Sequence, residues 1–132
     1  MSQHTSPLRH AVAESKALPR GRAGLVALEK ALQLAAAVAL IEIPRGLGHL
    51  RDHLVRAADN TVLRLSEASG RTLGHRYQHL EAAYAENQEV QSDLVLLLGR
   101  GVEVSPSVVD LASRAGGMVY GLLRAEWRAR SG

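Results

Sequence analysis

Residues 56–71 read "RAADNTVLRLSEASGR" and combine helix-favouring ends with a weak centre, where Asp59, Asn60 and Thr61 are poor helix formers. Apolar positions nevertheless continue through this centre in steps of three and four, the spacing of one helix face. They are Leu47, Leu50, Leu54, Ala57, Ala58, Thr61, Leu65 and Ala68. Because Asp59 and Asn60 fall on the opposite face, the pattern predicts one continuous amphipathic helix over about 47–69.

Apolar periodicity and helix start and stop residues predict three more helices, one before residues 47–69 and two after them. The first is predicted over about 23–43 and is ended by Pro44. Another runs over about 72–98, from Thr72 as its cap to the glycines at 99 and 101. The last begins at Ser105-Pro106, a favourable N-cap followed by a first-turn proline. Gly70 is predicted to supply a left-handed C-cap between the second and third helices.

This order predicts an all-α, antiparallel up-down-up-down four-helix bundle over residues 23–132. Residues 1–22 are interpreted as a flexible basic leader. The helix at 23–43 is apolar on two faces, so we expect a second cover besides its own bundle, either the leader or another subunit. The sequence therefore favours a homo-oligomer with the first or the fourth helix at the contact.

Two sets of residues suggest how neighbouring helices meet. Asn87 and Gln91 fall on the core seam of the third helix, which also includes Leu73, Tyr77, Leu80, Tyr84, Leu94 and Leu98. We interpret the two amides as groups that set register or bond across helices. Small residues at Gly116, Gly117 and Gly121 weaken the fourth helix, but they permit close approach of a neighbour.

Composition narrows the class of protein. The chain has 132 residues, 46% hydrophobic and only 3% aromatic, which predicts one domain with an aliphatic core. It has no cysteine, so no disulfide or thiolate metal site is expected. The sequence shows no apolar signal-peptide core, and its longest apolar run, 34–41, is too short to span a bilayer. We expect a cytoplasmic protein with no membrane partner.

The net charge of +3 lies entirely in residues 1–22, and the remaining chain holds 12 basic and 12 acidic residues. Binding of nucleic acid by the bundle would therefore need a local basic patch. Fourteen of the sixteen basic residues are arginine, which suits bidentate phosphate binding. A GC-rich genome would produce the same bias.

Catalytic and metal-binding patterns are not apparent in the sequence. The pairs His49/His53 and His75/His79 have a metal-binding spacing, but they fall too far apart along the bundle to share an ion. We interpret them as solvated surface residues. The acids of the third helix are expected to face solvent: Glu81, Glu86, Glu89 and Asp93. The sequence predicts no enzyme activity, no cofactor and no metal.

Arginines on three helices are the candidates for binding RNA or another nucleic acid. The set is Arg56, Arg64, Arg71, Arg76, Arg124 and Arg128, with Arg45 and Arg130 as outlying members. The alternative is that they form surface ion pairs, Asp52–Arg56, Glu67–Arg71 and Arg64–Glu67, at helical spacing. The C-terminal arginines also suit the negative end of a helix dipole.

Residues 56–71 resemble the signature of a family of small bacterial four-helix-bundle proteins. That family includes proteins encoded in intervening sequences of the large ribosomal RNA and the accessory variability determinants of diversity-generating retroelements. The resemblance rests on the Arg-Ala-Ala entry at 56–58, on Leu65 and Glu67, and on the Gly-Arg close at 70–71. A second family segment is similar to "AAYAENQEVQSDL" at 82–94.

The chain also departs from the family pattern. Asn60 and Thr61 replace a Ser-Ile pair, Arg64 stands where the family has Asn, and Ala68 where it has Gly. The resemblance implies a non-catalytic homo-oligomer, commonly a pentameric ring. In the retroelement branch it also implies binding to a reverse transcriptase and its RNA. The alternative from another class is a protein-binding scaffold without a nucleic-acid role.

Overall fold

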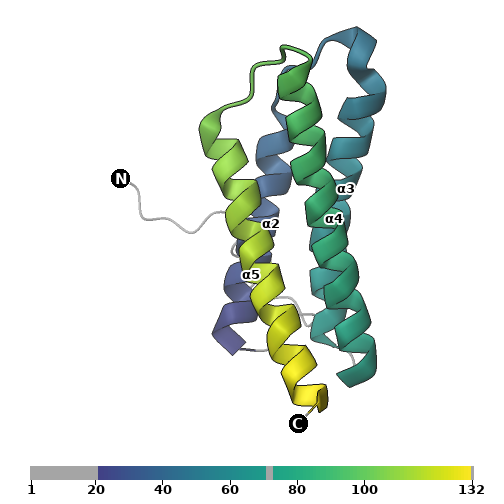
Figure 1. Ribbon diagram of the computed structural model, residues 1–132, viewed down its shortest axis with the longest axis vertical. Coiled ribbons are helices and arrows are strands. Elements are labelled where there is room, and N and C mark those ends of the chain that lie inside the picture. The colour runs from purple at the N-terminus through teal and green to yellow at the C-terminus, as the bar shows by residue number, and fades with distance from the viewer. Residues whose placement is uncertain (1–20, 71–72, 132) are drawn as a thin grey trace.

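The computed structural model describes residues 21–70 and 73–131, where four long helices lie side by side (Figure 1). They are α2 (Gly21–Ala39), α3 (Gly48–Ser69), α4 (Leu73–Gly99) and α5 (Pro106–Ser131), with a short 3-10 helix η1 (Arg45–Leu47) before α3. The described ranges contain no strand. In Figure 1 the connections α2–α3 and α4–α5 lie at the upper end, and α3 leads to α4 at the lower end. The predicted all-helical bundle of four helices is confirmed for these residues.

The four helices occupy the corners of a square. α2 packs against α3 and α5, and α4 packs against the same two helices, whereas the described residues give no contact across either diagonal. One core cluster, nearer the upper end, includes Leu34, Leu54 and Leu97. A second, nearer the lower end, includes Leu65 and Val119. The fully buried apolar side chains are all aliphatic, as the scarcity of aromatic residues predicted.

Helix α3 runs through its weak centre without a break, as predicted. Thr61 is fully buried, and its hydroxyl Oγ1 donates a hydrogen bond of 2.9 Å to the carbonyl of Ala57 one turn earlier. This bond satisfies the polar atom within the helix itself, so a threonine can lie in the core at little cost. Asp59 is exposed on the opposite face. The apolar stripe therefore has the phase that the sequence predicted.

The predicted end of the first helix is wrong by four residues, because α2 ends at Ala39 and not at about Ile43. The amide of Leu40 bonds to the carbonyl of Ala37 at 3.1 Å, so the last turn tightens before the chain leaves the helix. Pro44 disfavours helical geometry at the residue before it, and Ile43 lies outside any helix. Ile41 and Ile43 still pack against the upper core.

The left-handed glycine is Gly101 and not Gly70. Gly70 has φ −105°, whereas Gly101 has φ +80°. The amide of Val102 bonds to the carbonyl of Leu97, and the amide of Gly101 bonds to that of Leu98, both at 3.0 Å. These two bonds form a Schellman motif at the end of α4. Thr72, the predicted cap of this helix, lies outside the described residues.

The start of α5 is confirmed at Pro106, where Oγ of Ser105 accepts a hydrogen bond of 3.2 Å from the amide of Ser107.

On α4, the predicted seam is wrong at its last turn, because Leu98 is exposed and Leu97 is buried instead. Regular alternation of steps leads from Leu94 to Leu98, but the buried face takes a step of three instead and continues at Leu97. No helix in 21–70 or 73–131 has an apolar stretch that could cross a bilayer.

Candidate nucleic-acid interface

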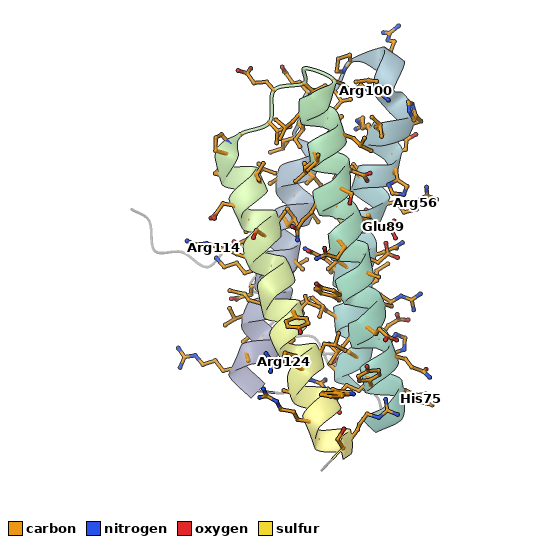
Figure 2. The ribbon with its side chains drawn as sticks, in the orientation of Figure 1. Arg56, His75, Glu89, Arg100, Arg114 and Arg124 are labelled. Carbon is orange, nitrogen blue, oxygen red and sulfur yellow. The ribbon has the colours of Figure 1, made fainter. Side chains whose placement is uncertain are left out.

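The last three turns of α5 carry exposed aromatic rings between exposed arginines. Tyr120 and Trp127 are 45% and 57% exposed, and Arg124 and Arg128 are exposed beside them. Their spacing of four, three and one residues places all four on one face of the helix. We call these four residues the α5 face. Figure 2 labels Arg124 near the lower end of the bundle.

Ring contacts hold parts of this region in place. The rings of Tyr120 and Tyr84 on α4 lie 5.4 Å apart between centroids. The guanidinium of Arg124 lies 5.9 Å from the centre of the Tyr120 ring, and that of Arg130 lies 4.6 Å from Tyr77. An arginine over a ring gains a cation–π contact, while its planar fork of donors can still reach a carboxylate or a phosphate.

The acidic residue within residues 120–131 points away from solvent. Glu126 accepts a hydrogen bond of 2.8 Å from Nε of Arg76, and both side chains are nearly buried. Nη1 of Arg76 also donates to the carbonyl of Ala68 at 3.1 Å. Since Glu126 is neutralised in this pair, the exposed charge of the α5 C-terminal turns is positive. Arg76 was a predicted nucleic-acid residue, but it joins α3, α4 and α5, so we leave it out of the interface.

The predicted arginines of α3 lie on another side of the bundle. Arg56 is exposed, and Arg64 is half-buried with Nη1 3.5 Å from Glu67, an ion pair that the sequence predicted. Asp52 instead has Arg51 at 3.6 Å. Arg71 lies outside the described residues. Because α3 and α5 occupy opposite corners, one chain does not bring Arg56 and Arg124 to one surface (Figure 2).

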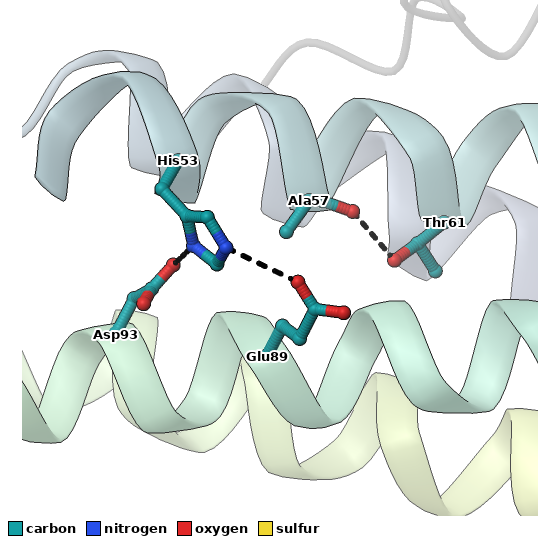
Figure 3. A network of polar contacts seen from close by, with 5 residues as sticks. All are labelled: His53, Ala57, Thr61, Glu89 and Asp93. Atoms are coloured by element: carbon teal, nitrogen blue, oxygen red, sulfur yellow. Dashed lines mark hydrogen bonds and ion pairs between the residues drawn. The ribbon is translucent and has the colours of Figure 1, made fainter. Parts of the chain in front are cut away.

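A polar cluster links the beginning of α3 to the second half of α4 (Figure 3). Nδ1 of His53 lies 2.5 Å from Oδ2 of Asp93, and Nε2 lies 3.3 Å from Oε1 of Glu89. The hydrogen bond and charge of Asp93, with help from Glu89, raise the pKa of His53 against the opposing effects of burial and Arg56. This cluster can hold a proton on the imidazole.

Two predictions about these charged side chains are wrong. Asp93 is buried and does not face solvent, because its carboxylate pairs with His53. His53 and His79 are not simply solvated, since Nδ1 of His79 lies 3.4 Å from Glu67 on α3. Within the described residues, no three histidine, aspartate or glutamate side chains are arranged to hold a metal ion.

The two predicted seam amides do bond across helices. Nδ2 of Asn87 donates to the carbonyl of Ala112 on α5 at 3.2 Å, and Nε2 of Gln91 donates to the same carbonyl at 3.5 Å. Within α4, Nε2 of Gln91 also donates to Oδ1 of Asn87 at 2.7 Å. A Cβ at Gly116 would overlap that same Oδ1. The amides and the glycine therefore fit each other, as structural contacts between α4 and α5. Of the three small residues predicted to allow close approach, only Gly116 has a neighbour among the described residues.

No protein-family model, curated protein or solved structure matches this chain. The resemblance of residues 56–71 to the intervening-sequence and retroelement family stays a prediction that rests on the residues quoted for it. The sequence interpretation singled out Arg124 and Arg128 but missed Tyr120 and Trp127. Their interleaving with arginine at helical spacing was the signal that could have identified the α5 face.

Proposed function

We propose that this protein is a cytoplasmic, non-enzymatic accessory protein that binds single-stranded RNA. In this proposal it is an antiparallel up-down-up-down bundle that assembles into a homo-oligomeric ring. The observation that carries the proposal is the α5 face, where two exposed aromatic rings alternate with two exposed arginines. Proteins that bind single strands use this combination, with arginines on phosphates and aromatic rings stacked on bases.

Assembly would strengthen a surface that is small in one chain. Two or three arginines neutralise few phosphates, so a single copy should bind weakly. Copies held in a ring present the same face repeatedly, and a second contact on one RNA then becomes intramolecular. The resemblance implies a pentamer, and it makes a reverse transcriptase with its RNA the first partner to test.

Exposed aliphatic side chains at the upper end support the assembly. Among the residues whose side chains are described, five of the eight large exposed hydrophobic residues lie after α2, in the last turns of α4 or in the first turn of α5. They are Leu40, Val95, Leu96, Leu98 and Val109. Leu40 is 81% exposed, so contact with another molecule would remove this apolar surface from water. Leu40 and Val109 agree with a contact through α2 or α5.

The second candidate function is a protein-binding scaffold, and the ion pairs of the surface arginines Arg64 and Arg114 favour it. Arg64 pairs with Glu67, and Arg114 pairs with Asp110 at 3.0 Å. Such pairs give these arginines a role without a ligand. The scaffold would use the same aliphatic upper end and would have no affinity for RNA.

The deciding experiment is fluorescence anisotropy with a labelled single-stranded RNA of about 20 nucleotides at about 50 and 200 mM salt. The wild type should lose at least about tenfold in affinity over this range, because about three phosphate contacts on a single strand give a slope near −2. Arg124→Glu/Arg128→Glu should abolish binding. Trp127→Ala should weaken it by about 1–3 kcal/mol through lost stacking.

The matched control is Arg56→Glu/Arg64→Glu, which makes the same change of charge on the opposite corner. It should retain most of the affinity. Loss of binding in this control alone would place the RNA interface on α3, in the stretch that carries the sequence resemblance. The triple variant Arg56→Glu/Arg64→Glu/Arg71→Glu would then test that interface. If the wild type binds no RNA at about 50 mM salt, the scaffold function stands instead.

A further inference from the structure

A pocket of about 930 Å³ opens at the upper end of the bundle, between the end of α2 and the start of α5. One wall is the connection after α2, which includes Leu40 and Glu42, and the other is the loop 101–106, which includes Glu103. These three side chains are exposed. Among the described residues, neither carboxylate takes part in an ion pair. The pocket therefore combines apolar walls with two negative charges that no basic group in this part of the chain neutralises.

The loop that forms one wall of the pocket is anchored in the upper core. Val102 and Val104 are buried there, and the Schellman motif at the end of α4 fixes the turn before them. Pro44 and Pro106 each line one wall, and each proline restricts its own backbone. A pocket whose backbone is already fixed loses little conformational entropy when a partner enters.

A basic and apolar patch lies on another side of the same end. Glu89, Asp93, Leu96 and Arg100 follow one another at steps of four, three and four, and therefore share one side of α4. The amide of Arg100 bonds to the carbonyl of Leu96 at 3.0 Å, so the helical spacing reaches Arg100. Glu89 and Asp93 contact His53, which places this side toward α3.

Leu96 and Arg100 are exposed at the end of this side, and we call them the α4 patch. Figure 2 labels Arg100 at the upper end of the bundle. Its guanidinium forms no ion pair with any of the described residues. The α4 patch therefore presents one free positive charge beside one aliphatic side chain.

The pocket and the α4 patch complement each other, but one chain cannot bring them together. The pocket lies on the α2–α5 side of the square, and the patch lies on the α3–α4 side. An arginine beside a leucine matches a pocket that has both carboxylates and apolar walls. Because both surfaces lie at the upper end, two copies with parallel axes bring the patch of one to the pocket of the other. Such a contact joins two different surfaces, as a ring of more than two subunits requires.

We propose that the pocket binds the α4 patch of a second copy of this chain. Arg100 of the second copy lies at the carboxylates of Glu42 and Glu103, and its Leu96 packs against Leu40. This contact rests on the homo-oligomer of the proposed function and names the surfaces that form it, whereas it involves neither the α5 face nor RNA. Each subunit uses its pocket on one side and its patch on the other, so subunits add until the ring closes.

The test is the dissociation constant of the assembly, measured by sedimentation equilibrium on full-length variants. Glu42→Arg and Arg100→Glu should each weaken association at least about tenfold, because like charges then face each other across the contact. Glu81→Arg is the matched control, since it makes an equal change at an exposed glutamate in the first half of α4. Its dissociation constant should stay within about twofold of wild type, because salt screens a charge so far from the contact.

Combining the two charge reversals decides whether these residues face each other. The variant Glu42→Arg/Arg100→Glu restores opposite charges across the contact, so its dissociation constant should return to within about threefold of wild type. An equimolar mixture of the two single variants should also assemble, since the patch of each matches the pocket of the other. Association that stays weak in both cases overturns the proposed contact.

The same measurement separates this contact from the assembly itself. A wild-type oligomer that neither single reversal weakens overturns the contact and leaves the proposed ring standing. A monomeric wild type overturns both. Circular dichroism of each variant should remain helical, because Glu42 and Arg100 are exposed in the single chain.

Discussion

His53 on α3 and Asp93 on α4 form a short hydrogen-bonded pair, with Nδ1 and Oδ2 2.5 Å apart. The two partners differ in exposure, since the imidazole is 43% exposed and the carboxylate only 6%. The buried carboxylate therefore depends on the histidine to satisfy its charge, while the histidine can exchange its proton with solvent. This relationship connects the packing of α3 against α4 to pH.

The first prediction concerns that pH dependence. Asp93 raises the pKa of His53 in the folded protein above its usual value of about 6.5. The pair with Asp93 therefore stabilises the fold fully at pH values below the pKa that His53 has in the unfolded chain. This stabilisation is lost as the pH rises through the pKa that His53 has in the folded protein. The difference in unfolding free energy between wild type and His53→Gln should therefore shrink between pH 5.5 and pH 8.5. Urea denaturation at the two pH values measures it.

His49→Gln is the control for this measurement, because His49 is an exposed histidine one turn earlier on the same helix. Its difference from wild type is the reference with which the pH dependence of the His53→Gln difference is compared. A His53→Gln difference that grows with pH would show that Asp93 does not hold a proton on His53.

The second prediction tests the core phase of α3. Leu54 is fully buried in the upper core, so Leu54→Ala should lower the unfolding free energy by about 2–5 kcal/mol. Leu63 is 57% exposed on the same helix, and Leu63→Ala should change it by less than about 0.5 kcal/mol. Urea denaturation of the two variants compares them directly, and similar values for both would mean that the helix is turned differently.

The third prediction separates two adjacent glycines. A methyl group at Gly116 would overlap Oδ1 of Asn87, so Gly116→Ala should be destabilising by about 1–3 kcal/mol. Gly117 has open space, and Gly117→Ala should stabilise by up to about 1 kcal/mol through helix propensity. Thermal unfolding should move in opposite directions for the two variants. A stabilising Gly116→Ala would show that α4 and α5 lie farther apart.

The fourth prediction concerns assembly. Sedimentation equilibrium at micromolar concentration should show a homo-oligomer, with a pentamer as the expected species. Leu40→Asp/Leu96→Asp should dissociate it, because charge replaces the exposed aliphatic surface at the upper end. Helical circular dichroism should be retained, as neither side chain is buried in the monomer. A monomeric wild type would remove the ring from the proposed function.

Local features of the fold could be predicted from the sequence because they depend on neighbours within one helix. The steps of three and four through residues 47–69 predicted the buried face of α3, including Thr61. Ser105-Pro106 predicted the start of α5, since a cap and its proline act within one turn. The glycines at 99 and 101 predicted the end of α4, although the left-handed role fell to Gly101 and not to Gly70.

Only the tertiary structure decided which charged groups meet. His53 and Asp93 are 40 residues apart, and Arg76 and Glu126 are 50 residues apart, so no helical spacing connects them. Their pairing depends on which helices are neighbours and on the offset of neighbouring helices along the bundle axis. Packing of the whole core sets both. For the same reason Arg76, an exposed arginine by its sequence alone, is buried, and the arginines of α3 and α5 lie on opposite corners of the bundle.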